Sequence, residues 1–279
     1  MLSLSLGPLV MSTQHLLLLL ALASALLAGW LTGRSRHVNP EHALLGLLLL
    51  ALSVSRIAFV AAYWTHYEGS ALSILDIRDG GFLVWPGLVA SLTAAAVYAW
   101  RRPVLRKPMA VALATGLTLW SLGNLTLGAL QDDARLPELT VHNAAGETVR
   151  LTDYEGKKLV INLWATWCPP CRREMPVLQA AQREHSDTVF LFVNQGETPD
   201  DIHTFLTRQA LHLDNMLFDS NGEVARYVGS AALPTTLFYQ PDGRFAGSHM
   251  GELSTASLMH YLNSLDDTPT ASSLQRSTQ

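Results

Sequence analysis

Two hydrophobic patterns divide the chain near residue 130. Before that point the apolar residues form long runs with almost no polar face. A helix needs about 20 apolar residues to cross a bilayer, and a helix in a soluble core would show polar positions at helical spacing. The pattern therefore predicts that residues 1–130 form a transmembrane region of about four helices, over residues 15–31, 42–64, 81–100 and 108–130.

Beyond residue 130, short apolar strands alternate with helices. "KLVINLWA" and "TVFLFVNQ" are typical of buried strands, and "PDDIHTFLTRQA" is typical of a helix with Pro and two Asp in its first turn. Hairpins are predicted in "LTVHNAAGETVRL" and around the Pro-Asp-Gly of "TTLFYQPDGRFAGSHM". This alternation predicts an α/β domain over residues 131–266, with a mostly parallel sheet and helices on both faces. The polar residues 267–279 are expected to be a disordered tail.

The net charge changes sign at the same place. Residues 1–130 hold 8 Lys/Arg and 4 Asp/Glu, whereas residues 131–279 hold 11 and 19. An acidic domain argues against nucleic acid as a partner, because phosphate binding needs a basic surface. The basic residues of the first part gather between the first two runs and between the last two, and basic loops stay cytoplasmic. We therefore expect a multi-pass protein of a bacterial inner membrane, embedded in the lipid bilayer, with its carboxy-terminal domain in the periplasm.

The only two cysteines of the chain stand in "WATWCPPCRREMP". Cys168 follows a predicted strand, and a helix is expected to begin near Pro169. Free backbone N–H groups and the helix dipole favour a thiolate at such a position. Cys171 lies almost one turn further on, close enough to attack a mixed disulfide formed at Cys168, so the spacing favours thiol–disulfide exchange.

Three other uses of the cysteine pair are possible. A structural disulfide closing so short a loop would stabilise little. A zinc site would need a second pair of ligands, and His203 and His212 are nine residues apart on or after a helix. A copper site made of the two thiolates and a distant His is the third. Redox exchange is favoured over all three, and no cofactor or metal is expected.

The residues "GKKLVINLWATWCPPCRREMPVL" and, later, "LPTTLFYQPDG" resemble the membrane-anchored TlpA/ResA/DsbE-like branch of the thioredoxin superfamily. The resemblance covers about Leu136 to Leu265. It implies an α/β thioredoxin-like domain with a central mixed sheet. It also implies a cis peptide before Pro234, in a loop that faces the cysteines and pairs with the substrate backbone through Leu233 and Thr235. Trp167 is expected to cover the disulfide and contact a client.

Two further residues bear on proton transfer. Thioredoxin itself carries a buried acid six positions before the first cysteine, where this chain has Asn162, which cannot relay a proton. Glu174 matches an acid that the branch carries three residues after the second cysteine, and we interpret it as a modulator of thiol protonation. The alternative is an exposed helix Glu paired with Arg172 or Arg173.

The membrane half bears a second resemblance. "SRIAFVAAYWTHY" and "DIRDGGFLVWPGLVA" resemble parts of prolipoprotein diacylglyceryl transferase, although Trp85 stands where that family has a functional His. The resemblance implies a truncated, degenerate transferase remnant serving as an anchor. Arg56 matches the family, and an intramembrane Arg is a functional candidate by default; it could instead pair with Asp76 or Asp79.

These observations predict a membrane-anchored periplasmic protein-disulfide reductase. Its clients would be disulfide-bearing proteins such as apocytochrome c or the copper-site protein of an oxidase. The alternatives are a dithiol oxidase or isomerase, a diacylglyceryl transferase with an appended redox domain, and a metal chaperone. Because no cysteine lies in the membrane runs, a separate transmembrane thiol carrier is expected to re-reduce the pair.

Overall fold

The computed structural model describes residues 3–6, 9–34, 38–67, 74–132 and 134–266. The chain divides into two compact units. One consists of Thr13–Ile77 and Gly81–Ala129, and the other of Met1–Ser12, Arg78–Gly80 and Leu130–Gln279. The predicted domain boundary near residue 130 stays a prediction, and the predicted tail, 267–279, lies outside the described residues.

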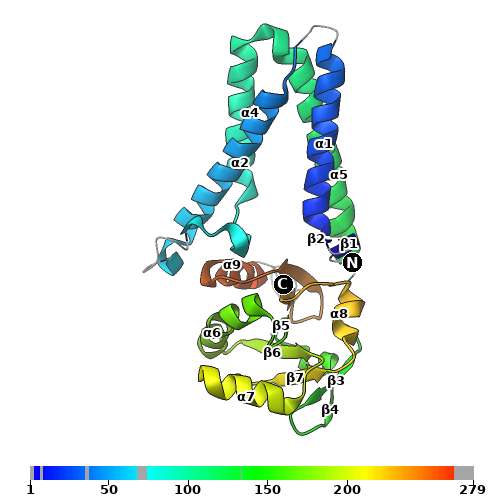
Figure 1. Ribbon diagram of the computed structural model, residues 1–279, viewed down its shortest axis with the longest axis vertical. Coiled ribbons are helices and arrows are strands. Elements are labelled where there is room, and N and C mark those ends of the chain that lie inside the picture. The colour runs from blue at the N-terminus through cyan, green and yellow to red at the C-terminus, as the bar shows by residue number, and fades with distance from the viewer. Residues whose placement is uncertain (1–2, 7–8, 35–37, 68–73, 133, 267–279) are drawn as a thin grey trace, which may run out of the picture. The chain divides into compact units, whose positions relative to one another are not determined.

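The first unit is helical (Figure 1). Its long helices are α1 (Thr13–Arg34), α2 (Glu41–Ala62), α4 (Val84–Arg101) and α5 (Arg106–Asp132), with the short 3-10 turns η1 (Trp64–Tyr67) and η3 (Pro103–Leu105). The 3-10 turn η2 (Ile77–Asp79) is divided between the two units. Helices α2 and α4 pack closely at Gly87, where a Cβ atom would collide with the Ser55 hydroxyl and the Ala51 carbonyl. The absence of a side chain at Gly87 therefore lets these two helices approach.

Three helical segments of the described residues, not four, are long and apolar enough to cross a membrane. They are Thr13–Arg34, Glu41–Ala62 and Pro103–Gln131. The third predicted run forms α4, whose 18 residues are near the lower limit of length for a membrane span. Its Trp, Pro, Tyr and Arg side chains, however, make its mean hydropathy lower than that of the other three segments. The predicted four-helix transmembrane region is therefore corrected to three candidate spans.

Arg56 lies on α2 and is 8% exposed. It donates hydrogen bonds to the backbone carbonyls of Ile74 (3.2 Å), Asp76 (2.7 Å) and Gly81 (3.0 Å). A Cβ atom on Gly81 would collide with the Phe59 ring and with the Arg56 guanidinium. Arg56 thus holds the backbone between α2 and α4 in place, which is a structural role for this arginine.

The second unit contains a seven-stranded sheet in the order β4-β3-β7-β6-β5-β8-β9. The strands are β3 (Thr140–Asn143), β4 (Thr148–Arg150), β5 (Lys158–Trp164), β6 (Thr188–Gln195), β7 (Met216–Asp219), β8 (Thr235–Tyr239) and β9 (Phe245–Met250). Only the β5–β6 and β6–β7 pairs of this sheet are parallel, and its other pairs are antiparallel. The predicted mixed sheet is confirmed, whereas "mostly parallel" was wrong because each predicted hairpin adds two antiparallel pairs, one within the hairpin and one with the neighbouring strand of the sheet. A separate two-stranded sheet, β1 (Ser3–Leu6) with β2 (Leu9–Ser12), was not predicted.

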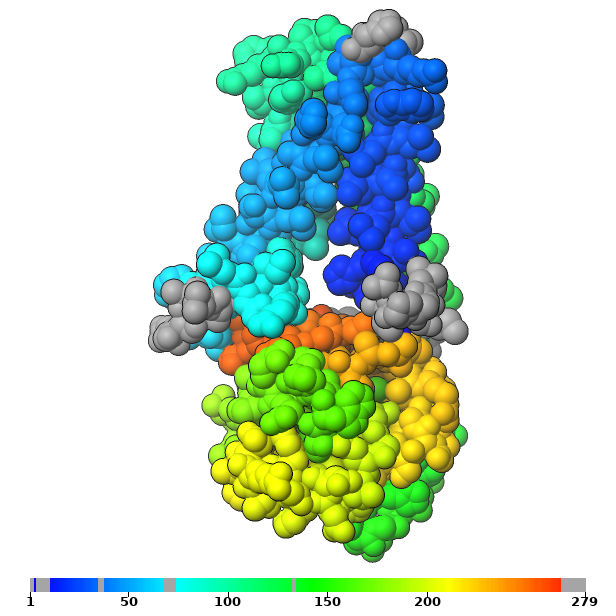
Figure 2. Space-filling view, viewed as in Figure 1, coloured from blue at the N-terminus to red at the C-terminus, as the bar shows by residue number. Residues whose placement is uncertain are grey.

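Helices cover both faces of the large sheet, as expected. They are α6 (Pro169–Glu184), α7 (Pro199–Gln209), α8 (Glu223–Val228) and α9 (Thr255–Asp266), with the short turn η4 (Leu151–Tyr154). Side chains of α6, α7 and α9 join one hydrophobic cluster, and side chains of α8 and η4 join the other. In the space-filling view, α6 in green and α7 in yellow lie against one another (Figure 2).

Strand β5 contributes to both clusters by alternation along its length. Leu159, Ile161 and Leu163 face the α8 side, while Val160 and Trp164 face the α6 side. Successive side chains of a strand point to opposite faces, so Asn162 also faces α6. A polar residue is therefore placed inside the apolar layer directly beneath the helix that carries the cysteines.

Candidate active site

The two cysteines lie where β5 ends and α6 begins. The chain leaves β5 through a turn closed by a hydrogen bond from the Cys168 N–H to the Ala165 carbonyl (3.3 Å). Cys168 is the N-cap of α6, with extended φ and ψ, and its Sγ accepts a hydrogen bond from the Cys171 N–H (3.4 Å). Pro169 occupies the first turn, where no N–H is needed. The predicted placement of Cys168 at a helix N-terminus is confirmed.

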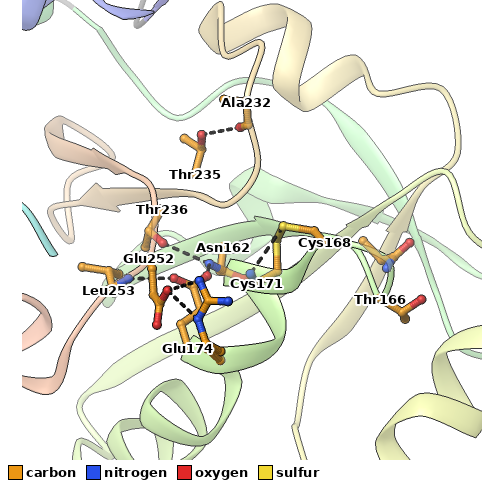
Figure 3. Close-up of a disulfide and its surroundings, with 12 residues drawn as sticks. Asn162, Thr166, Cys168, Cys171, Glu174, Ala232, Thr235, Thr236, Glu252 and Leu253 are labelled. Carbon is orange, nitrogen blue, oxygen red and sulfur yellow. Dashed lines mark hydrogen bonds and ion pairs between the residues drawn. A yellow bond between two sulfur atoms is a disulfide. The ribbon is translucent and has the colours of Figure 1, made fainter. Parts of the chain in front are cut away.

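Cys168 and Cys171 form a disulfide, with Cα atoms 5.3 Å apart (Figure 3). Cys168 is 3% exposed and Cys171 is completely buried. Trp167, next to Cys168, is 67% exposed, so its ring is available for the predicted contact with a client. The pair can pass two electrons to or from a disulfide while the protein backbone keeps the two sulfurs close.

Across the described ranges, no group of three or more His, Cys, Asp or Glu side chains could hold a metal ion. His203 lies within α7 and His212 beyond its end, and both cysteines are joined to each other.

Glu174 lies one turn after Cys171 on α6 and is completely buried. Its Oε1 accepts a hydrogen bond from Asn162 Nδ2 (2.8 Å), and its Oε2 accepts one from the Leu253 N–H (2.9 Å). Burial raises the pKa of the Glu174 carboxyl to about 8; the hydrogen bonds from Leu253 and Asn162 oppose this rise, and the charge of Glu252 adds to it. The Glu174 carboxyl is therefore largely protonated at neutral pH, and it can release or take up a proton at a pH close to neutral.

The exposed-Glu alternative for residue 174 was wrong. Arg173 instead donates from Nε to Glu252 Oε2 (2.8 Å), and the Arg172 guanidinium lies over the Phe205 ring, 5.7 Å from its centre. The Arg173–Glu252 pair joins α6 to the loop before α9. The next residue of that loop, Leu253, donates its N–H to Glu174.

Asn162 connects Glu174 to β8. Its Nδ2 donates both to Glu174 and to Thr236 Oγ1 (3.0 Å), whereas its Oδ1 is buried with no partner among the described residues. Buried polar atoms without a partner are uncommon. Asn162 Oδ1 thus belongs to the same buried cluster of polar side chains as Glu174. When Glu174 is protonated, its O–H needs a hydrogen-bond acceptor in that cluster.

The loop before β8 reaches the same end of β5. Leu163 pairs with Thr235 in antiparallel register, and the peptide between Leu233 and Pro234 is cis, as the resemblance implied. Leu233 is partly buried. Thr235 is completely buried, and its hydroxyl donates to the Ala232 carbonyl (2.8 Å). Its predicted contact with a substrate therefore depends on its backbone, since its side chain braces the loop.

Several site residues were missed in the sequence. Thr236, Glu252 and the Leu253 N–H surround Glu174, and Asn194 and Glu197 hold the turn before Cys168. Asn194 and Glu197 could have been found from the sequence, because they lie at the end of the second buried strand and just after it. The carboxyl ends of parallel neighbouring strands meet at one edge of a sheet, and ligands bind at that edge in α/β folds. The Leu253 contact had none, because it is made by a backbone group 79 residues from Glu174.

Comparisons with known proteins agree with this geometry. The model of the AhpC/TSA family matches residues 133–246. The chain is 28% identical over 144 residues to thioredoxin-like protein YneN of Bacillus subtilis (strain 168), covering 50% of this chain and 84% of the relative. It is 34% identical over 120 residues to thiol-disulfide oxidoreductase ResA of Oceanobacillus iheyensis, covering 42% and 62%.

Solved structures are similar over the same half of the chain. One is a thiol:disulfide interchange protein of the thioredoxin family from Chlorobium tepidum TLS, with 22% identity and a TM-score of 0.41, covering 47% of this chain and 94% of the other. The family match begins at residue 133, so it does not test the transferase resemblance of residues 1–130, which stays a prediction. In its paired cysteines at a strand–helix junction and its mixed sheet, the carboxy-terminal half is similar to thioredoxin-like thiol-disulfide oxidoreductases such as ResA.

Proposed function

We propose that this protein is a membrane-anchored reductase of disulfides in client proteins outside the cytoplasm. The observation that carries the proposal is the Cys168–Cys171 disulfide at the N-terminus of α6, with the buried Glu174 one turn further along the same helix. An N-terminal helix dipole stabilises a thiolate at Cys168. A carboxyl group with a pKa of about 8 is suited to accept the proton of Cys171.

The reaction then has two exchange steps. The Cys168 thiolate attacks a client disulfide, forms a mixed disulfide and expels one client thiolate. The ionised Glu174 takes the proton of the Cys171 thiol, and the Cys171 thiolate attacks the Cys168 sulfur. The Cys168–Cys171 disulfide forms as the second client thiolate leaves, so two electrons have passed to the client.

Several features support reduction of protein clients. Trp167 is exposed beside Cys168, and the Pro234 loop lies at the end of the strand that leads to Cys168. The resemblance to the TlpA/ResA/DsbE-like branch supports clients of the apocytochrome c or oxidase copper-site type. Oxidised protein would be reduced again by a separate transmembrane thiol carrier, because the chain has no cysteine besides this pair.

The reduction potential of the Cys168–Cys171 pair tests the direction of the reaction. We expect a value near that of thioredoxin, roughly −270 mV, which belongs to a reductant. The measurement equilibrates the detergent-solubilised full chain with glutathione or dithiothreitol buffers and counts free thiols. A value near −120 mV, typical of a strong oxidant, would replace the reductase by the dithiol oxidase.

Residence of the redox domain outside the cytoplasm is supported by the basic residues. Arg34 ends α1, Arg101 ends α4, Arg102 follows α4, and Arg106 and Lys107 begin α5. Basic segments of this kind stay cytoplasmic. An anchor with these basic segments in the cytoplasm would hold the redox domain on the opposite, outer side of the membrane, where disulfides of client proteins persist.

Reporter fusions test this location. A reporter that is active only outside the cytoplasm should be active when fused after Asp266 and silent when fused at Arg102. The proposed location requires α4 to cross the membrane as well, although α4 is not among the three candidate spans. With three crossings and Arg34 in the cytoplasm, Arg102 would lie outside and the redox domain inside, so the paired fusions test α4 directly. Activity at Arg102 would show that α4 does not return the chain to the cytoplasm, and silence after Asp266 would exclude the proposed compartment.

A further inference from the structure

The turn that presents Cys168 is held by a side chain from the neighbouring loop. Thr166, two residues before Cys168, donates its N–H to Glu197 Oε2 (2.7 Å), and its hydroxyl donates to Glu197 Oε1. Both carboxylate oxygens of Glu197 therefore bind one residue of the turn. Hydrogen bonds to an ionised acceptor are about twice as strong as those between neutral groups.

Glu197 is itself fixed by Asn194, which is completely buried at the end of β6. Asn194 Nδ2 donates to Glu197 Oε2 (2.7 Å), and the Glu197 N–H donates to Asn194 Oδ1 (3.2 Å). Gly196, with a φ of +80°, lets the chain reverse between the two residues. The carboxylate is thus held in a preset position rather than on a free loop.

The sheet explains why this contact forms. Strands β5 and β6 are parallel, with Trp164 paired to Asn194. Parallel neighbours end at the same edge, so the segment after β5, which leads to Cys168, lies beside the segment after β6, which carries Glu197. Thr166 is followed by the exposed Trp167 and then by Cys168, so the contact with Glu197 acts on the part of the turn that a client would meet.

We propose that Glu197 is a positioning residue that clamps the turn Ala165–Cys168 and so orients Trp167 and Cys168 for exchange with protein disulfides. The inference rests on the proposed function for its kinetic consequence. Glu197 does not touch the sulfurs, and its action passes through Thr166.

The kinetic test compares a protein disulfide with a small one, using the full chain in detergent. Glu197→Ala should lower kcat/KM for insulin reduction about tenfold and for oxidised glutathione less than threefold, because a small disulfide needs Cys168 but not an ordered turn. Thr166→Val should act similarly, and the double variant should be no worse than either alone. Glu197→Gln should restore most of the loss, since an amide can accept from the Thr166 N–H and donate to its hydroxyl.

Glu147→Ala is the matched control. Glu147 makes the same exchange of hydrogen bonds with an Asn side chain, accepting from Asn143 Nδ2 (2.8 Å) and donating its N–H to Asn143 Oδ1 (2.9 Å), but it lies in the β3–β4 hairpin. This variant should leave both rates unchanged. Equal losses for the two disulfides in Glu197→Ala, additive losses in the double variant, or the same loss in Glu147→Ala would overturn the inference.

Hydrogen exchange of the Thr166 N–H separates this inference from the proposed function. The peptide that contains Thr166 should exchange at least tenfold faster in Glu197→Ala and at the wild-type rate in Glu197→Gln and Glu147→Ala. This result is expected even if the wild-type protein reduces neither disulfide, which would refute the reductase alone. Unchanged exchange in Glu197→Ala would refute the clamp, whatever the activity.

Discussion

Replacing Cys171 with serine is expected to trap client proteins as mixed disulfides on Cys168. The attacking thiol is then intact, but the second exchange step has no nucleophile, so turnover should stop after the first. Cys168→Ser should trap none, because Cys171 is completely buried whereas Cys168 retains some exposure at the N-terminus of α6. Each variant is expressed in full length, and adducts are detected on non-reducing gels after acid quenching.

The trapping experiment discriminates between the two thiols and between classes of function. The double variant, Cys168→Ser with Cys171→Ser, gives the background of non-specific adducts. Equal trapping by the two single variants would mean that the helix terminus does not select the nucleophile. An absence of adducts in Cys171→Ser, with the protein folded and oxidisable before substitution, would favour a metal chaperone or a purely structural disulfide over the reductase.

Much of the carboxy-terminal fold followed from local pattern. The apolar run that forms β5, the following Cys168–Pro169 junction and the hairpin of β8 and β9 all carry their information within a few residues. Turn residues and strand length decide such elements locally. The direction of pairing between distant strands has no local signal, which is why the strand patterns did not predict the antiparallel contact of β5 with β8.

The candidate site shows the same division between local and distant information. Cys168, Cys171 and Glu174 follow one another at intervals of three residues, about one turn of α6. This spacing alone places the three side chains close together. The contacts that set their properties come from elsewhere in the chain: Thr236 from β8, the Leu253 N–H from the loop before α9, and Glu197 from the loop after β6. Glu174 could be recognised by position, but its burial and its Asn162 partner could not be derived from one sequence.

The membrane half was predicted less well for a physical reason. Continuous apolar composition indicates a helix, but crossing a bilayer also depends on length and on a few costly side chains near the helix ends. Helix α4 has only 18 residues and ends at Arg101. Its close packing on α2 at Gly87 and the Arg56 contacts to the intervening backbone depend on a partner helix, and no periodicity within α4 reveals them.

Glu174→Gln is expected to slow the second exchange step about a hundredfold, within the range usual for loss of a general acid–base. In the wild type, the raised pKa of about 8 means that Glu174 is protonated below that pH and ionised above it. Only the ionised form can accept the proton of Cys171. The rate of resolution should therefore rise as the pH increases through about 8, and this rise should be lost in Glu174→Gln, where only the titration of the thiols remains.

Resolution is measured in a single turnover, from a mixed disulfide preformed on Cys168 of the full chain, between pH 6 and pH 10. Glu252→Gln is the matched control, because the negative charge of Glu252 raises the pKa of Glu174. Removal of the Glu252 charge should move the rise in resolution rate to lower pH without reducing the maximal rate. Glu252→Gln also breaks the ion pair with Arg173, which could displace the Leu253 N–H from Glu174. Arg173→Gln breaks the same pair without removing the Glu252 charge, and so isolates that effect. If Glu174→Gln kept both the rate and the rise near pH 8, another group would be the proton acceptor for Cys171.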